Sequence, residues 1–129
     1  MHQRPDPLDL LAAVAGFLRE QALPQLPPHA AYNARIAANA LDIVRRQLHL
    51  APEAEAAEQH RLRVLLQRDG GLAELNLLLC ERIAGGDIGF DTPGLLPHLW
   101  QTTLDKLAVD QPGYDSYRRE SAADEETRA

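Results

Sequence analysis

One segment, residues 32–48 with the sequence YNARIAANALDIVRRQL, has the apolar spacing of an α-helix and constrains the fold most strongly. At about 100° per residue, its apolar side chains cover roughly half of the helix circumference. They are Tyr32, Ile36, Ala37, Ala40, Leu41, Ile43, Val44 and Leu48. A surface helix needs an apolar stripe of only about 100°. We therefore expect this helix to contact more than one neighbour and to lie at the centre of the fold.

The rest of the chain also has helical spacing. Ala and Leu are abundant while Val, Ile, Thr and Tyr are scarce, which favours helix over sheet. Helices are expected over 7–22, 28 or 29–49, from Pro52 to before Asp69, 72–84 and 93–109. No segment alternates like a strand, and 129 residues suit one domain. The predicted fold is all-α: a four- to five-helix antiparallel bundle over 7–118, with an N-terminal arm, 1–6, and a disordered C-terminal tail, 119–129.

Local signals set the helix ends. Asp6-Pro7 and Thr92-Pro93 each place a capping residue before a proline, as at a helix start. Gly85-Gly86 is typical of a helix end, so the run Gly85-Gly86-Asp87-Ile88-Gly89 is interpreted as a C-cap and not as a phosphate-binding loop. Ala51-Pro52 is expected to break the chain between two helices.

Charge and cysteine content exclude several classes of protein. The net charge is −6, with the acidic excess beyond Ala51, so no basic patch for nucleic acid is present. Cys80 is the sole cysteine and is expected to be a buried, inert thiol, and the absence of a disulfide fits a reducing cytoplasm. No signal peptide or membrane-spanning stretch is visible, so we expect a soluble cytoplasmic protein.

The sequence contains no recognisable catalytic or metal-binding motif. The histidines at 2, 29, 49, 60 and 98 are never three or four residues apart, and no Glu-x-x-His pair occurs, so surface histidines are the ordinary interpretation. No catalytic residue, cofactor or metal site is therefore predicted, and an enzyme is the less favoured class.

Four polar residues, Arg35, Asn39, Asp42 and Arg46, fall on one face of the helix expected at 28–49. Three explanations are open. The first is a solvated ladder of pairs within the helix, which contributes only tenths of a kcal/mol. The others are a surface that binds a protein or a small anion, and a network between helices.

Two amides and several aromatic residues are the remaining candidates. Asn33 and Asn76 fall within apolar arcs, so both are expected to be buried and hydrogen-bonded, to each other or to loop backbone, with a ligand contact as the alternative. Trp100 is expected in the core, although an exposed Trp100 would indicate an interface. Tyr114 and Tyr117 could dock on the helical body or contribute to that interface.

Three segments together, RPDPLDLLAAVAGFLRE, YNARIAANALDIVRRQL and DKLAVDQPGYDSYR, resemble a family of small bacterial helical domains of unknown function. The likeness covers roughly residues 4–118. Members of this family are encoded beside, or fused behind, aminoglycoside/choline-phosphotransferase-like kinases, often near acyl-CoA dehydrogenases. The resemblance implies an accessory role beside such an enzyme and supplies no catalytic residue.

The function hypotheses follow from these observations. The leading one is a non-catalytic helical accessory domain that binds another protein, with a phosphotransferase-like or acyl-CoA-metabolising enzyme as partner. The alternative is a small-molecule binder with a pocket between the second, fourth and fifth expected helices, lined by Asn33, Asn76 and Trp100. The surplus of apolar surface could also be shared in a homodimer.

Overall fold

The computed structural model describes residues 4–128, apart from the side chains of residues 116 and 123–128. No β-strand occurs among residues 4–128, which confirms the predicted all-α class. The α-helices are α1 (Pro7–Phe17), α2 (Pro28–Leu66), α3 (Leu72–Ala84), α4 (Leu95–Asp110) and α5 (Asp115–Arg128). They belong to two compact units, an N-terminal unit, Met1–His49, and a C-terminal unit, Leu50–Ala129.

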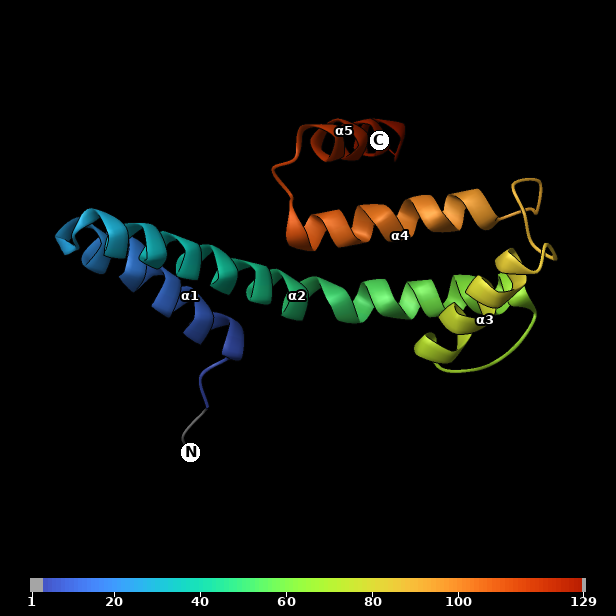
Figure 1. The fold of residues 1–129 in the computed structure, drawn as a ribbon, viewed down its shortest axis with the longest axis horizontal. Helices are drawn as coiled ribbons and strands as arrows, with labels where there is room; N and C mark the ends of the chain where they lie inside the picture. Colours follow the sequence, from blue (N-terminus) through green and yellow to red (C-terminus); the bar gives the residue numbers. More distant parts are fainter. Residues whose placement is uncertain (1–3, 129) are drawn as a thin grey trace. The chain divides into compact units, whose positions relative to one another are not determined.

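In the N-terminal unit, α1 runs back along the first part of α2 (Figure 1). As predicted, Asp6 caps α1: its carboxylate accepts a hydrogen bond from the Leu8 N–H at 2.9 Å, and Pro7 takes the first helical position. A π-helical turn, η1 (Leu18–Ala22), and a 3₁₀ turn, η2 (Leu23–Gln25), follow α1 and lead into α2.

The packing between α1 and α2 relies on small side chains. Among the described residues of this unit, the buried ones are Ala15, Ala34 and Ala38. The prediction that the apolar arc of residues 32–48 forms the centre of the fold is wrong, because its large members, such as Tyr32 and Ile36, are exposed. Alanines bring two helix backbones close together but remove little apolar surface from water.

The predicted break at Ala51-Pro52 is also wrong, since α2 continues through Pro52 to Leu66. Proline within a helix removes one backbone hydrogen bond and costs about 3 kcal/mol. Pro52 is exposed, so water can hydrate the carbonyl group that it leaves without a partner. The boundary between the two units falls within this helix, at Leu50, two residues before the proline.

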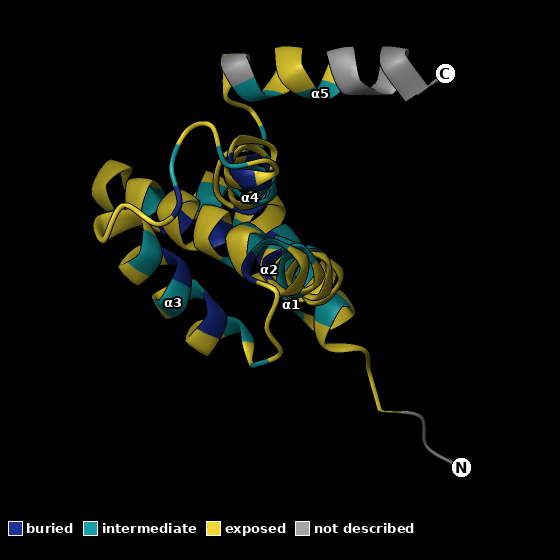
Figure 2. Ribbon diagram, turned by 90° about the vertical axis from the view of Figure 1, so that its right-hand side faces the viewer, coloured by how far each residue is buried: buried dark blue, intermediate teal, exposed yellow. Residues whose placement is uncertain are grey.

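The main apolar core lies in the C-terminal unit, where the second part of α2 packs with α3, α4 and the loop before α4 (Figure 2). Its members are Leu62, Leu66, Leu75, Leu79, Ile88 and Leu95. Leu62 and Leu75 are completely buried. Burying a leucine side chain contributes about 1.5–3 kcal/mol, so this cluster is the main source of stability in the unit.

Two helix ends in this unit have left-handed caps. At the end of α2, Gln67 has a φ of 53° and the Arg68 N–H bonds to the Arg63 carbonyl, the pattern of a Schellman motif. Gly86, with a φ of 83°, does the same after α3, as the Gly85-Gly86 pair predicts. Arg82 on α3 adds a side-chain cap, donating from Nη1 to the Leu66 carbonyl at 3.1 Å.

The last two helices differ from expectation, because α4 begins later than predicted and no helix was expected at the position of α5. The Thr92 hydroxyl accepts a hydrogen bond from the Gly89 N–H and closes the loop, so α4 begins at Leu95 after Gly94 and not at Pro93. A turn at 111–114 then leads into α5. The predicted tail, 119–129, overlaps the second part of α5. The structure does not describe residue 129 or the side chains from residue 123 on, so the disorder of this tail stays a prediction.

Candidate functional site

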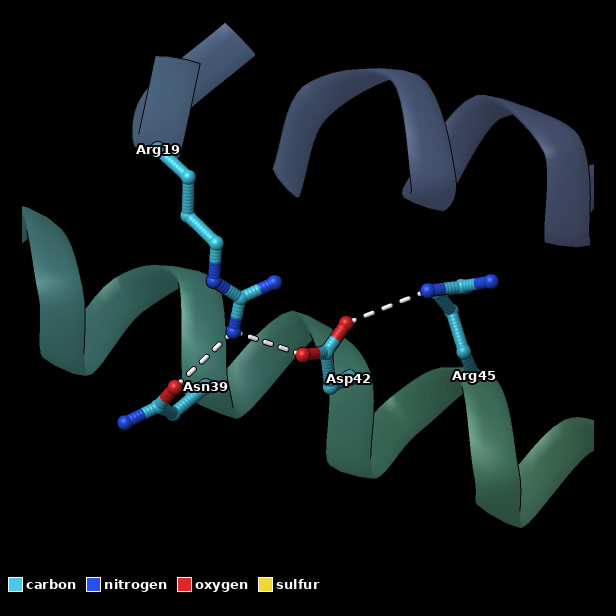
Figure 3. Close-up of polar contacts among 4 residues, drawn as sticks. All are labelled: Arg19, Asn39, Asp42 and Arg45. Atoms are coloured by element: carbon cyan, nitrogen blue, oxygen red, sulfur yellow. Dashed lines mark hydrogen bonds and ion pairs between the residues drawn. The ribbon is translucent and has the colours of Figure 1, made fainter. Parts of the chain in front are cut away.

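The predicted polar face of α2 takes part in a network with the N-terminal segment (Figure 3). Arg19, in the π-helical turn η1, donates from Nη2 to the Asn39 amide oxygen at 2.9 Å and to an Asp42 carboxylate oxygen at 2.6 Å. Arg45 donates from Nη1 to the other Asp42 oxygen at 3.1 Å. Of the three explanations for this face, the structure therefore supports a network between helices. Arg19 is its central donor and was not recognised from the sequence.

Two arginines, Arg19 and Arg45, share the single carboxylate of Asp42 in this network. The hydrogen bond from Arg19 holds the pKa of Asp42 below its usual range, with Arg45 adding to the effect and partial burial opposing it. Arg46 and His49 line the same small hollow, while Arg35 is exposed. Asp42 engages one nitrogen of each guanidinium, Nη2 of Arg19 and Nη1 of Arg45, and so partly offsets their charge.

The C-terminal unit has a larger groove between the second part of α2 and α4. Its volume is about 1120 Å³. Apolar side chains make up most of its walls, including Leu50, Ala54, Ala57, Val64, Leu65, Pro93 and Pro97. The polar residues at the groove include His60, Arg61, His98, Gln101 and Asp105. A cavity of this size with mostly apolar walls and a few polar groups has the composition of a small-molecule site.

Arg61 and His98 form the polar centre of this groove. Arg61 donates from Nε to His98 Nδ1 and from Nη2 to the Thr102 hydroxyl, both at 3.1 Å. His98 is only 3% exposed, so the expectation of a surface histidine is wrong here. Burial lowers the pKa of His98, the Arg61 charge lowers it further, and Glu58 opposes the shift. The ring is therefore neutral at pH 7, with Nδ1 accepting and the proton on Nε2.

A sequence signal for His98 exists, because it lies three residues after Leu95 and four before Thr102. These positions continue the buried side of α4. Arg61 could not be singled out, since its importance depends on a partner 37 residues away. Within the part of the chain that the structure describes, no group of three or more His, Cys, Asp or Glu side chains could hold a metal ion.

The outer face of α4 carries an uncovered aromatic residue. Trp100 is 51% exposed and lies with Leu96, Leu99, Pro97 and Thr103 around a shallow hollow of about 610 Å³. The expectation of a core tryptophan is therefore wrong, and an interface role for Trp100 stays a prediction. Tyr114 is exposed and Tyr117 half-buried.

Three further candidates are corrected. Asn33 is exposed, so the prediction of a buried amide at this position is wrong. Asn76 is half-buried and donates to a Glu58 carboxylate oxygen at 3.0 Å, which gives it a structural partner on α2. Cys80 is exposed because it lies at the edge of the α3 stripe, where the neighbouring Leu79 takes the buried position.

Comparisons with known proteins give one match. No helix among the described residues is long and apolar enough to cross a membrane. No curated protein and no solved structure shows significant similarity to the chain. Residues 24–114, which include all of α2, α3 and α4, match a family described as "Domain of unknown function (DUF6285)", and the chain belongs to this family.

Proposed function

We propose that this chain is a non-catalytic helical domain that binds another protein through the outer face of α4. The observation that carries the proposal is Trp100, a large aromatic side chain left half exposed between two exposed leucines. Leu96, Leu99, Trp100 and Thr103 follow the i, i+3, i+4, i+7 spacing of one helix face. Exposed tryptophan surrounded by aliphatic side chains is typical of the residues that dominate protein interfaces.

The charge of the C-terminal unit supports a partner with a basic rim around its apolar contact. Residues 50–129 contain fifteen acidic residues and eight lysines or arginines. Such a surplus attracts a positively charged surface and repels an acidic one, which affects the association rate and the choice of partner.

The partner we favour is a phosphotransferase-like or acyl-CoA-metabolising enzyme. The resemblance of this sequence to domains encoded beside such enzymes supports this choice, and any chemistry would then belong to the partner. Within a complex, the present chain would position or stabilise the enzyme.

Co-expression with a neighbouring phosphotransferase-like protein, followed by co-purification and titration calorimetry, tests the proposal. Trp100→Ala is expected to weaken binding roughly tenfold or more, because it empties the centre of the contact. Leu77→Ala on α3 is a matched control, since Leu77 is 62% exposed and lies on another helix. No association at micromolar concentrations, or equal binding by Trp100→Ala and the parent protein, would contradict the proposal.

A second candidate function is binding of a small amphipathic anion in the groove between α2 and α4. The observation that favours it is Arg61, whose two described hydrogen-bond acceptors are uncharged, while apolar walls surround it. A guanidinium with neutral partners retains N–H donors for a carboxylate or sulfonate.

The fluorescent anion anilinonaphthalene sulfonate can serve as the probe for this candidate. The parent protein is expected to bind the probe. Arg61→Gln is expected to bind it clearly less well, because the substitution removes the positive charge of that side chain. Arg63→Gln is the control, as Arg63 pairs with the exposed Asp69 outside the groove. Equal binding by all three proteins would count against this function.

A further inference from the structure

The N-terminal unit has little core of its own, although both of its helices are rich in apolar residues. Among its residues from 4 to 49, the buried ones are three alanines, while several large apolar side chains remain about half exposed. These alanines and half-buried leucines such as Leu11, Leu18 and Leu41 together bury too little apolar surface to offset the entropy of ordering two helices. Additional apolar contact is therefore needed to stabilise this hairpin.

Five of the exposed large apolar residues lie on one side of the hairpin, whereas Tyr32, Ile36 and Ile43 lie elsewhere on α2. On α1, Leu10, Val14 and Phe17 are rotated by about 100–160° in one direction from Ala15, which faces α2. On α2, Ala37, Val44 and Leu48 are rotated by roughly 60–100° in the same direction from the Ala34–Ala38 contact line. In an antiparallel pair of helices, two residues that are rotated from the contact line in the same sense, each viewed along its own chain direction, lie on the same side of the pair. These residues, together with Ala40, are called the apolar face below.

Polar residues occupy the opposite side of the hairpin. Arg19 donates to Asn39 and to Asp42 there, and Arg45 donates to Asp42 as well. The apolar face contains no charged residue. The hairpin as a whole is therefore amphipathic, with one face suited to water and the other suited to burial.

We infer that the apolar face is covered by the same face of a second copy of this chain. Two amphipathic hairpins stacked in this way form a four-helix arrangement with a twofold axis. Because Ala37 and Ala40 lie on the face, the copies can approach closely, while Val14, Phe17, Val44 and Leu48 fill the space between them. This interface is separate from the α4 surface proposed for a protein partner.

Charge favours self-association through this unit and not through the other. Residues 1–49 contain five arginines and four acidic residues, so two copies bring together almost no net charge. Residues 50–129 have seven more acidic than basic residues, and pairing two such units would be opposed by repulsion.

The apolar face alone offers slightly less area than the smallest specific interfaces, which suits a weak dimer. A large apolar residue exposes about 180 Å² when free, so five half-exposed ones and two alanines offer on the order of 500 Å² per copy. Specific interfaces begin near about 600 Å² per partner, and rim contacts add to the apolar centre. A dissociation constant in the micromolar range is therefore expected.

Sedimentation equilibrium of the full chain, from low to high micromolar concentration, tests this inference. The parent protein is expected to pass from monomer to dimer. Val14→Glu combined with Val44→Glu is expected to remain a monomer throughout, because the dimer would bury four carboxylates without partners. Ile36→Glu is the matched control. Ile36 has the same 49% exposure as Val14 but lies on the far side of α2, so this variant is expected to dimerise normally.

A second measurement separates loss of association from loss of folding. With Cys80 replaced by serine, Val44→Cys is expected to form a disulfide-linked dimer on oxidation, whereas Ile36→Cys is expected to stay monomeric. A parent protein that is monomeric at every concentration would overturn the inference. So would a dimer that survives the double glutamate variant or is lost in Trp100→Ala, and the second of these results would identify α4 as the self-association surface.

Discussion

The two units use different physical means to hold helices together. The C-terminal unit packs leucines from α2, α3 and α4 into a continuous core, whereas the N-terminal unit brings α1 against α2 through alanines and bonds them with Arg19 and Asp42. Leucine burial contributes a large, non-directional stabilisation, while exposed ion pairs contribute at most about 1 kcal/mol each. The comparison teaches that helical spacing alone does not reveal where a core forms, since both units have it.

The largest effect is expected in the leucine core. Leu75→Ala removes a completely buried side chain and is expected to lower the free energy of unfolding by about 2–5 kcal/mol, measured by urea denaturation. Leu77→Ala, on the exposed side of the same helix, is the control and is expected to change it by less than about 0.5 kcal/mol. Similar losses in both variants would mean that the C-terminal unit is not built around this cluster.

A smaller effect is expected where the N-terminal helices meet. Ala38 is completely buried, so Ala38→Leu forces α1 and α2 apart and is expected to cost about 1–3 kcal/mol. Hydrogen exchange is the most direct measurement, because amides of α1 would exchange faster while those of α3 would not. The exposed Ala56→Leu is the control. Unchanged exchange in α1 would show that the close alanine contact does not exist.

The two units are expected to respond to acid in different pH ranges. The pKa of His98 is lowered from its ordinary 6.5, so the unfolded chain takes up this proton first, and stability falls as the pH drops below 6.5 toward the folded value. The pKa of Asp42 is lowered from 3.8, so the ionised carboxylate stabilises the folded protein above pH 3.8, and this stabilisation is lost at lower pH. Denaturation of the parent protein and of His98→Gln at several pH values below 6.5 checks the loss of stability assigned to His98. The variant has no histidine at this position and is expected to lack this loss.

The smallest effect is expected at the end of α2, where the left-handed conformation of Gln67 is unfavourable for any residue with a side chain. Gln67→Gly relieves this strain and is expected to raise the free energy of unfolding by about 0.5 kcal/mol, after the extra entropy of glycine in the unfolded chain is deducted. Gly86→Ala, at the equivalent position after α3, is expected to lower it by about 1 kcal/mol. A loss in Gln67→Gly would mean that the side chain has a structural role.

Features set by neighbouring residues could be predicted from the sequence. The Asp6 cap, the bounds of α3 and the Gly85-Gly86 end follow from local hydrogen bonding and backbone freedom, which act within a few residues. The helical class follows in the same way. Thr92-Pro93 failed as a helix start because the threonine hydroxyl bonds to the loop instead.

Features set by distant contacts could not be predicted. Pro52 is accepted within α2 because its position is exposed, and exposure depends on the whole fold. Arg19 and Arg61 look like ordinary surface arginines until their partners are known, and those partners lie 23 and 37 residues away. His98 is buried and Trp100 is exposed, the reverse of what was expected, because the neighbours of α4 decide which of its sides is covered.

The hydrogen bond from Arg82 to the Leu66 carbonyl has a consequence for how the chain folds. The last turn of α2 obtains this partner only after the chain has turned back and α3 has formed, because Arg82 lies sixteen residues after Leu66. Until then, that turn frays in water, so α2 gains its full length together with α3 and not before it. Loss of α3 would therefore shorten the preceding helix as well, and the two would open and close as one cooperative element.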